Sequence, residues 1–134
     1  MIKKIEHLGI AVKDLSVAIP LYEKLFQTPC YKKEAVESEG VKTAFFQIGE
    51  SKLELLEATH ADSPIAKFLE KRGAGFHHVA FEVENIDQEI ARLQAEDFQL
   101  IHSTAKDGAD NKRIAFLHPK SSDGLLVELC QEKS

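Results

Sequence analysis

Two stretches of the chain decide its fold, because the second repeats the first. Residues 5–15 read IEHLGIAVKDL and residues 76–86 read FHHVAFEVENI. Aligned on His7 and His78, the stretches lie 71 residues apart, and a segment with helical periodicity follows each of them. Self-similarity at a fixed spacing predicts a fold made of two copies of one supersecondary unit.

The repeat continues through the rest of each half. Residues 42–46 (KTAFF) match 113–117 (RIAFL) at the same offset, and 53–55 (LEL) match 127–129 (VEL) after a longer loop. Alternating apolar residues, cap residues and turn glycines predict a strand, a helix and three strands in each half. The first half is expected at 5–12, 16–26, 31–37, 41–48 and 52–57, and the second at 76–83, 87–96 and around Leu100, Ile114 and Leu126.

We therefore expect an α+β fold of two tandem βαβββ modules, about 1–60 and 74–131. A short helix over 63–72 joins them, with Ser63 as its cap, Pro64 at its first position and Gly73 at its end. Pro20 is expected in or near the first turn of the 16–26 helix, where the missing amide hydrogen costs least. The loop at 108–111 follows the Leu100 strand.

Strand alternation separates the residues that pack under a helix from those on the other face. In the first strand Leu8, Ile10 and Val12 share the helix face, so His7 points the other way. The same reasoning selects His78 rather than its neighbour His77. In the later strands, Glu54 and Glu128 point away from their leucine and valine neighbours.

Each half thus offers one histidine and one glutamate from the interior of a strand. Related by approximate twofold symmetry, His7, Glu54, His78 and Glu128 would converge on one point and hold a single divalent cation. Two imidazoles and two carboxylates suit Co²⁺, Ni²⁺, Mn²⁺, Fe²⁺ or Zn²⁺. The alternative is that these are structural residues without an ion, but a buried unpaired carboxylate costs several kcal/mol.

Composition limits the possible partners. The 134 residues suit one domain, and 22 acidic against 17 basic residues give a net charge of −5. Nucleic-acid binding is therefore not expected, because phosphate contacts need clustered cations. No apolar run approaches the ~20 residues that span a bilayer, and no secretory leader is expected, so we predict a cytoplasmic protein. We expect Cys30 and Cys130 to be reduced thiols.

At these residues the sequence resembles the vicinal-oxygen-chelate superfamily, and within it the methylmalonyl-CoA epimerases. The resemblance covers nearly the whole chain. Residues 6–12 and 77–83 mark the superfamily, whereas 62–69 (DSPIAKFL), 116–120 (FLHPK) and 124–129 (GLLVEL) are more specific to the epimerases. It implies a curved mixed sheet around a metal site whose ligands are His7, Glu54, His78 and Glu128. Some members have glutamine at the Glu54 position.

The resemblance also implies a reaction, the interconversion of (2R)- and (2S)-methylmalonyl-CoA through a metal-stabilised enolate. Glu128 is the first candidate for proton transfer and Glu54 a weaker second. Some epimerases carry an acid/base glutamate where this chain has Thr43, a hydroxyl that cannot abstract a carbon-bound proton. We expect one divalent ion, Co²⁺ first, with Zn²⁺, Ni²⁺ or Mn²⁺ as alternatives.

Binding of an acyl-CoA needs cations for its phosphates. Candidates for contact with the substrate gather in the second half: Asn111, Lys112, Arg113 and Lys120. The family commonly forms homodimers, which is the expectation for this chain. Three other functions stay open: glyoxalase I, an extradiol dioxygenase, and a non-catalytic small-molecule-binding protein of the same fold.

Overall fold

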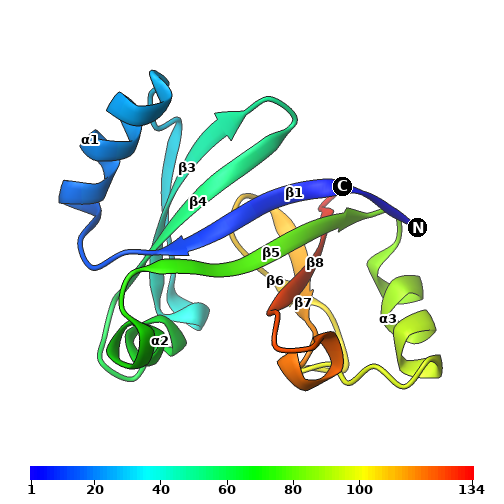
Figure 1. Ribbon diagram of the computed structural model, residues 1–134. Helices are drawn as coiled ribbons and strands as arrows, with labels where there is room; N and C mark the ends of the chain where they lie inside the picture. Colours follow the sequence, from blue (N-terminus) through cyan, green and yellow to red (C-terminus); the bar gives the residue numbers. More distant parts are fainter. The chain divides into compact units, whose positions relative to one another are not determined.

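The computed structural model describes residues 1–134 and contains eight strands and three α-helices (Figure 1). The first half comprises β1 (Ile2–Ala11), α1 (Leu15–Phe26), β2 (Lys32–Val36), β3 (Val41–Ile48) and β4 (Ser51–Ala58). Helix α2 (Pro64–Arg72) follows, and the second half comprises β5 (Gly75–Val83), α3 (Ile86–Ala95), β6 (Lys106–Asp107), β7 (Lys112–Phe116) and β8 (Val127–Glu132). Each half is therefore a βαβββ module, and the predicted α+β class is confirmed.

The chain divides into two compact units that do not follow the modules strictly. The N-terminal unit contains residues 7–77, and the C-terminal unit contains residues 1–6 and 78–134. Strand β1 thus contributes residues to both units, and so does β5. No helix in the structure is both long and apolar enough to cross a membrane.

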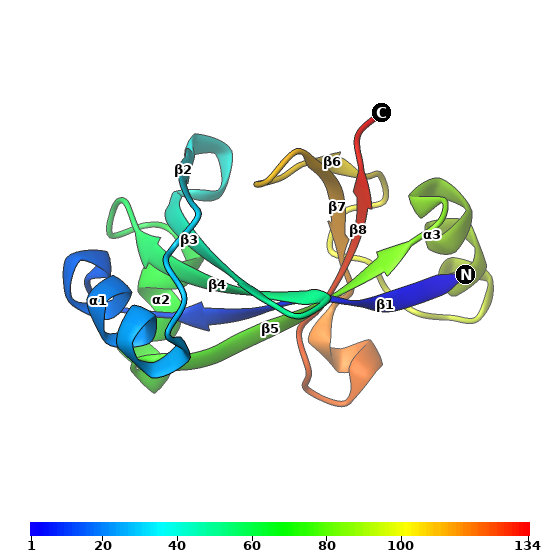
Figure 2. The same cartoon turned by 90° about the horizontal axis from the view of Figure 1, so that it is seen from above.

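In the N-terminal unit the strands run in the order β2-β3-β4-β1. Strands β1 and β4 are parallel, whereas the β2–β3 and β3–β4 pairs are antiparallel (Figure 2). Helix α1 packs on one face through an apolar cluster that includes Leu15, Ile19, Phe46 and Leu55. Asp14 caps this helix by accepting a hydrogen bond from the Ser16 amide at 2.9 Å.

In the C-terminal unit the order is β5-β8-β7-β6, again with one parallel pair, β5–β8, and antiparallel neighbours. Helix α3 covers one face through a cluster that includes Val79, Ile90, Val127 and Leu129. The strands of the two units therefore repeat the same order of connections, as the sequence repeat predicts.

Most of the predicted helix and strand boundaries agree with the structure to within a few residues. Ser63 caps α2 as predicted, because its hydroxyl accepts a hydrogen bond from the Ala66 amide at 3.1 Å. Two predictions were wrong. Pro20 lies inside α1 rather than in its first turn. No strand forms around Leu100, which makes only an isolated bridge to Leu117, and the short β6 pairs with β7 instead. Both cysteines are free thiols, as expected.

Candidate functional site

The N-terminal unit holds one buried imidazole–carboxylate pair. Nε2 of His7 in β1 lies 3.3 Å from Oε1 of Glu54 in β4, and both residues are 5% exposed. The strand register places Glu54 opposite Gly9, two residues after the histidine. Glu54 points away from α1 because Leu53 and Leu55 occupy the helix side, as strand alternation predicts.

The C-terminal unit holds an equivalent pair. Nε2 of His78 in β5 lies 3.0 Å from Oε1 of Glu128 in β8, and these residues are 3% and 5% exposed. Glu128 stands opposite Ala80, again two residues after the histidine. The second unit therefore reproduces the residue types, the parallel strand pairing and the register of the first.

The neighbouring histidine, His77, has a different environment. Its ring packs edge-on against Phe68 of α2 at 4.8 Å between centroids. The ring of Phe116 packs edge-on against His78 at 5.8 Å. Within its unit, His78 and not His77 therefore has the position and the carboxylate neighbour that His7 has in the other unit.

Each pair brings a nitrogen donor and a carboxylate donor together away from bulk water. An imidazole that faces a carboxylate can share a proton with it, or both atoms can turn to a divalent cation. The donors of each pair, one imidazole nitrogen and one carboxylate oxygen, have the chemistry that a borderline divalent ion prefers.

Thr43 lies on the same face of its sheet as Glu54. Its register partner is Leu56, and its neighbour on that face, Phe45, stands opposite Glu54. The residue is buried, and its hydroxyl donates to the backbone oxygen of Glu34 at 3.2 Å. A hydroxyl held in this way has no route to act as a general base.

The four candidates for substrate contact have different positions. Lys112 is buried at the start of β7. Arg113, the next residue, pairs with Asp87 of α3 through two contacts of 3.2 Å, which hold the pKa of its guanidinium above the ordinary value. Alternation therefore places Arg113 on the helix side, away from Glu128. A face comparison of β7 with β8 in the sequence would have separated these two cations.

Asn111 and Lys120 lie in loops. Asn111 has a left-handed backbone, and its side-chain amide donates to the backbone oxygen of Lys133 at 3.4 Å, so it orders the turn before β7. Lys120 is exposed in a short 3₁₀ helix, Pro119–Ser122, which His118 caps through Nδ1.

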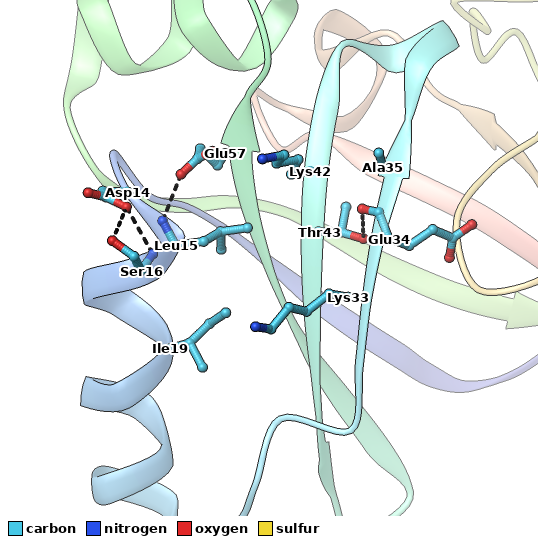
Figure 3. Close-up of a pocket in the computed structure, with 10 residues that line it drawn as sticks. All are labelled: Asp14, Leu15, Ser16, Ile19, Lys33, Glu34, Ala35, Lys42, Thr43 and Glu57. Carbon is cyan, nitrogen blue, oxygen red and sulfur yellow. Dashed lines mark hydrogen bonds between the residues drawn. The ribbon is translucent and has the colours of Figure 1, made fainter.

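A pocket of about 450 Å³ lies in the N-terminal unit beside the start of α1 (Figure 3). The Asp14 and Glu57 carboxylates in its wall are already engaged, because they accept from the Ser16 and Leu15 amides. Those contacts from Ser16 hold the pKa of Asp14 below its ordinary value. Lys33 and Lys42 reach the pocket from the α1 side of the sheet, opposite the face of Glu54. The pocket is therefore separate from the His7–Glu54 pair.

Comparison with known proteins identifies relatives over almost the full length. Residues 6–116 match the model of the glyoxalase/bleomycin resistance protein/dioxygenase superfamily. YqjC of Bacillus subtilis, an uncharacterised protein, is 42% identical over 97% of this chain and 93% of its own length. Human mitochondrial methylmalonyl-CoA epimerase is 37% identical over 96% of this chain and 73% of its own length.

A solved structure supports the same relationship. A methylmalonyl-CoA epimerase in complex with methylmalonyl-CoA and NH₄⁺ is 33% identical, covers 100% of this chain and 97% of its own, and has a TM-score of 0.96. At such identity and coverage, both the fold and the family are shared. The chain belongs to the glyoxalase/bleomycin resistance protein/dioxygenase superfamily and, within it, to the family of the methylmalonyl-CoA epimerases.

Proposed function

We propose that this chain is an epimerase that interconverts (2R)- and (2S)-methylmalonyl-CoA with the help of one divalent metal ion. The observation that carries the proposal is the repeated buried pair, His7 with Glu54 and His78 with Glu128, at equivalent register positions. The names of the relatives support the substrate, because full-length relatives act on methylmalonyl-CoA by name.

The metal would be held by His7, Glu54, His78 and Glu128. The support is chemical, because in each pair a buried imidazole nitrogen lies beside a buried carboxylate oxygen. The sequence repeat adds that the two pairs occupy equivalent positions. Co²⁺ is our first choice, and Zn²⁺, Ni²⁺ and Mn²⁺ suit the same donors. When bound, the cation supplies positive charge where negative charge develops on the substrate oxygens.

The protein's own task is to move a proton at the α-carbon. We assign removal of that proton to the Glu128 carboxylate: the C–H electron pair moves into the adjacent carbonyl system, and the proton bonds to a Glu128 oxygen. Inversion then requires return of a proton on the opposite face. Glu54 is the candidate for that step, because Thr43 offers no suitable group.

The nucleotide end of the substrate needs cations at the surface. Lys120 is exposed and unhindered on its loop, so it suits a phosphate. Asn111 shapes the neighbouring turn. Arg113 is held by Asp87 and would have to leave that ion pair before it could bind a phosphate.

Proton exchange at the α-carbon tests this function directly. Purified protein loaded with Co²⁺ is incubated with methylmalonyl-CoA in deuterated buffer, and NMR follows loss of the α-proton signal. We expect exchange that a chelator stops and that added Co²⁺ restores. Failure to exchange in the loaded protein would refute the proposal, and turnover of methylglyoxal with glutathione instead would identify a glyoxalase I.

The remaining expectations concern assembly and location. We propose a homodimer, as the family resemblance suggests, and a cytoplasmic location, as the sequence analysis predicts. Size-exclusion chromatography with light scattering measures the mass, and a species of about 15 kDa, the mass of one chain, would contradict the dimer.

A further inference from the structure

Helix α1 leaves part of its own sheet uncovered. The apolar cluster beneath it includes residues of α1, β3 and β4, but no residue of the edge strand β2. In the β2–β3 register Lys33 stands opposite Ala44, a member of that cluster. Ala35, two residues further along β2, stands opposite Lys42. Both lysines and Ala35 therefore lie on the α1 face, where they line the pocket of about 450 Å³ (Figure 3).

The two lysines of this pocket lack counter-ions. Lys33 and Lys42 occupy diagonal positions on neighbouring strands, which lie roughly 7–8 Å apart in a sheet. Neither forms an ion pair in the structure, and Figure 3 shows both side chains extending from the sheet toward α1. By contrast, Lys32 on the other face of β2 pairs with Glu34 at 3.4 Å. Two ammonium groups on one face repel one another, and an anion between them would be attracted by both.

The acidic residues in the wall of the pocket are bound to the helix instead. Glu57 stands opposite Lys42 in the β3–β4 register, yet its carboxylate accepts a hydrogen bond from the Leu15 amide at 2.8 Å. Asp14 accepts from the amide and the hydroxyl of Ser16, at 2.9 and 2.7 Å. These contacts also occupy the first two amides of α1. The lysines are therefore the groups that remain to bind a ligand.

The rest of the wall limits the kind of ligand. Leu15 and Ile19 of α1 are apolar, and Ala35 contributes only a methyl group. A volume of about 450 Å³ is in the range of small-molecule sites and is more than a bare inorganic anion needs. Two ammonium groups match a dianion, and lysine binds phosphate as a point charge, whereas the planar fork of arginine suits a carboxylate better. The ligand that fits is thus a phosphate monoester with a compact apolar body.

We propose that this pocket binds a phosphate monoester, with its phosphate between Lys33 and Lys42 and its apolar body against Leu15 and Ile19. The pocket lies on the face of the sheet opposite Glu54, so it is separate from the site of the proposed reaction. Its ligand is a second molecule rather than the substrate. The proposal therefore does not depend on the epimerase function.

Protein NMR tests the site with phenyl phosphate as the probe. Titration of the full-length, isotope-labelled protein should move the amide signals of Ile19, Lys33 and Ala35. Inorganic phosphate lacks the apolar body and benzoate lacks the second charge, so each should bind about tenfold more weakly than phenyl phosphate. The double variant Lys33→Gln/Lys42→Gln should weaken phenyl phosphate binding about tenfold or more. Both lysines are exposed, so this variant should fold, with a Tm equal to or above that of the wild type.

The matched control is Lys32→Gln, which removes a cation from the same strand but from the opposite face. It should leave the affinity for phenyl phosphate within about twofold of wild type. Wild-type affinity in the double variant would overturn the proposal, as would benzoate binding as tight as that of phenyl phosphate or signal changes confined to residues outside the pocket.

A second comparison separates a free ligand from the substrate. CoA carries a phosphate monoester on its ribose that dephospho-CoA lacks. We expect the two compounds to have the same effect on the amide signals of the pocket. If CoA alone moved those signals, the pocket would hold part of the substrate, and the proposal of a second molecule would be wrong.

Discussion

Oε1 of Glu128 lies 3.0 Å from Nε2 of His78, and both side chains are buried. If Glu128 removes the α-proton, Glu128→Gln keeps its shape but loses its base. We expect α-proton exchange to fall about 100-fold or more, because general-base catalysis contributes about 10²–10⁴-fold. NMR in deuterated buffer measures the rate. The matched variant Glu132→Gln, exposed on the same strand, should keep wild-type exchange. Wild-type exchange in Glu128→Gln would exclude Glu128 as the base.

Metal content should depend on the two histidines. We expect about one equivalent of divalent metal per chain in the wild type, and substantially less in His7→Ala and His78→Ala. His102→Ala, at an exposed position, is the control and should retain the metal. Elemental analysis gives the stoichiometry. Added Co²⁺ should raise Tm with its concentration, because a ligand that binds only the native state stabilises it. A Tm that changes with neither chelator nor added Co²⁺ would argue against a metal site in this protein.

Thr43 should be dispensable for catalysis. Thr43→Val keeps the volume and removes one hydrogen bond, from the hydroxyl to the Glu34 backbone oxygen. We expect exchange within about twofold of wild type and a loss of about 1 kcal/mol in the free energy of unfolding. Denaturant unfolding and the NMR assay measure the two quantities. A tenfold loss of exchange in a fully folded variant would show that the hydroxyl takes part.

Glu89 should make stability depend on pH. Its buried carboxylate accepts hydrogen bonds from the Met1 ammonium and from Arg92, and these contacts lower its pKa, the ammonium contributing most. A lowered native pKa stabilises the fold above the ordinary carboxyl pKa, and the contribution disappears as pH falls through the native pKa. Glu89→Gln should therefore cost on the order of 1–2 kcal/mol at pH 7 and progressively less below about pH 4.

The control for Glu89 is on the same helix. Glu96 also faces Arg92, but at 3.7 Å and largely exposed, so Glu96→Gln should change the unfolding free energy little at any pH. Urea unfolding at several pH values measures both variants. A Glu89→Gln cost that stays constant from pH 7 to pH 3 would contradict the assignment.

Two glycines provide a matched test of close packing. Gly40 and Gly49 both have positive φ, +66° and +59°. A Cβ at Gly40 would lie 2.7 Å from the Cβ of Ser63, whereas a Cβ at Gly49 would meet nothing within 4 Å. Gly49→Ala should cost about 1–2 kcal/mol from backbone strain. Gly40→Ala should cost about 1–3 kcal/mol more from overpacking. Equal unfolding free energies would contradict this difference.

Most of what could be predicted about the site came from the alternation of side chains along the strands. It predicted that Glu54 and Glu128 lie on the face of the sheet away from the helices, and it selected His78 over His77. Each side chain of a strand can lie on only one of the two faces, and its place in the alternation decides which. It also separates Lys112 from Arg113 once β7 and β8 are compared. The pairing of Arg113 with Asp87 was not visible, because it depends on how α3 lies against the sheet.

The errors have local causes. The sequence around Leu100 predicted a strand, but the backbone there does not form a regular ladder of hydrogen bonds. The Gln99 amide donates to the Ser121 hydroxyl, and the Ile101 amide donates to the Phe116 carbonyl. Pro20 is tolerated beyond the first turn of α1 because this side of the helix is exposed, so water can reach the Ser16 carbonyl that receives no amide hydrogen from the proline. Neither the hydrogen bonds around Leu100 nor the exposure of Pro20 can be predicted from the pattern of residues.

The division of β1 between the two units has a consequence for the order in which the chain folds during synthesis. Residues 7–77 form a unit that is complete once its own residues have left the ribosome. Residues 1–6 are made first but belong with 78–134, where Glu84 donates to the Met1 carbonyl at 3.2 Å. Residues 1–6, which include the beginning of β1, must therefore wait for the last module, a long loop closure that slows folding. Neither half of the duplication, cut at the α2 linker, carries all the residues of either unit.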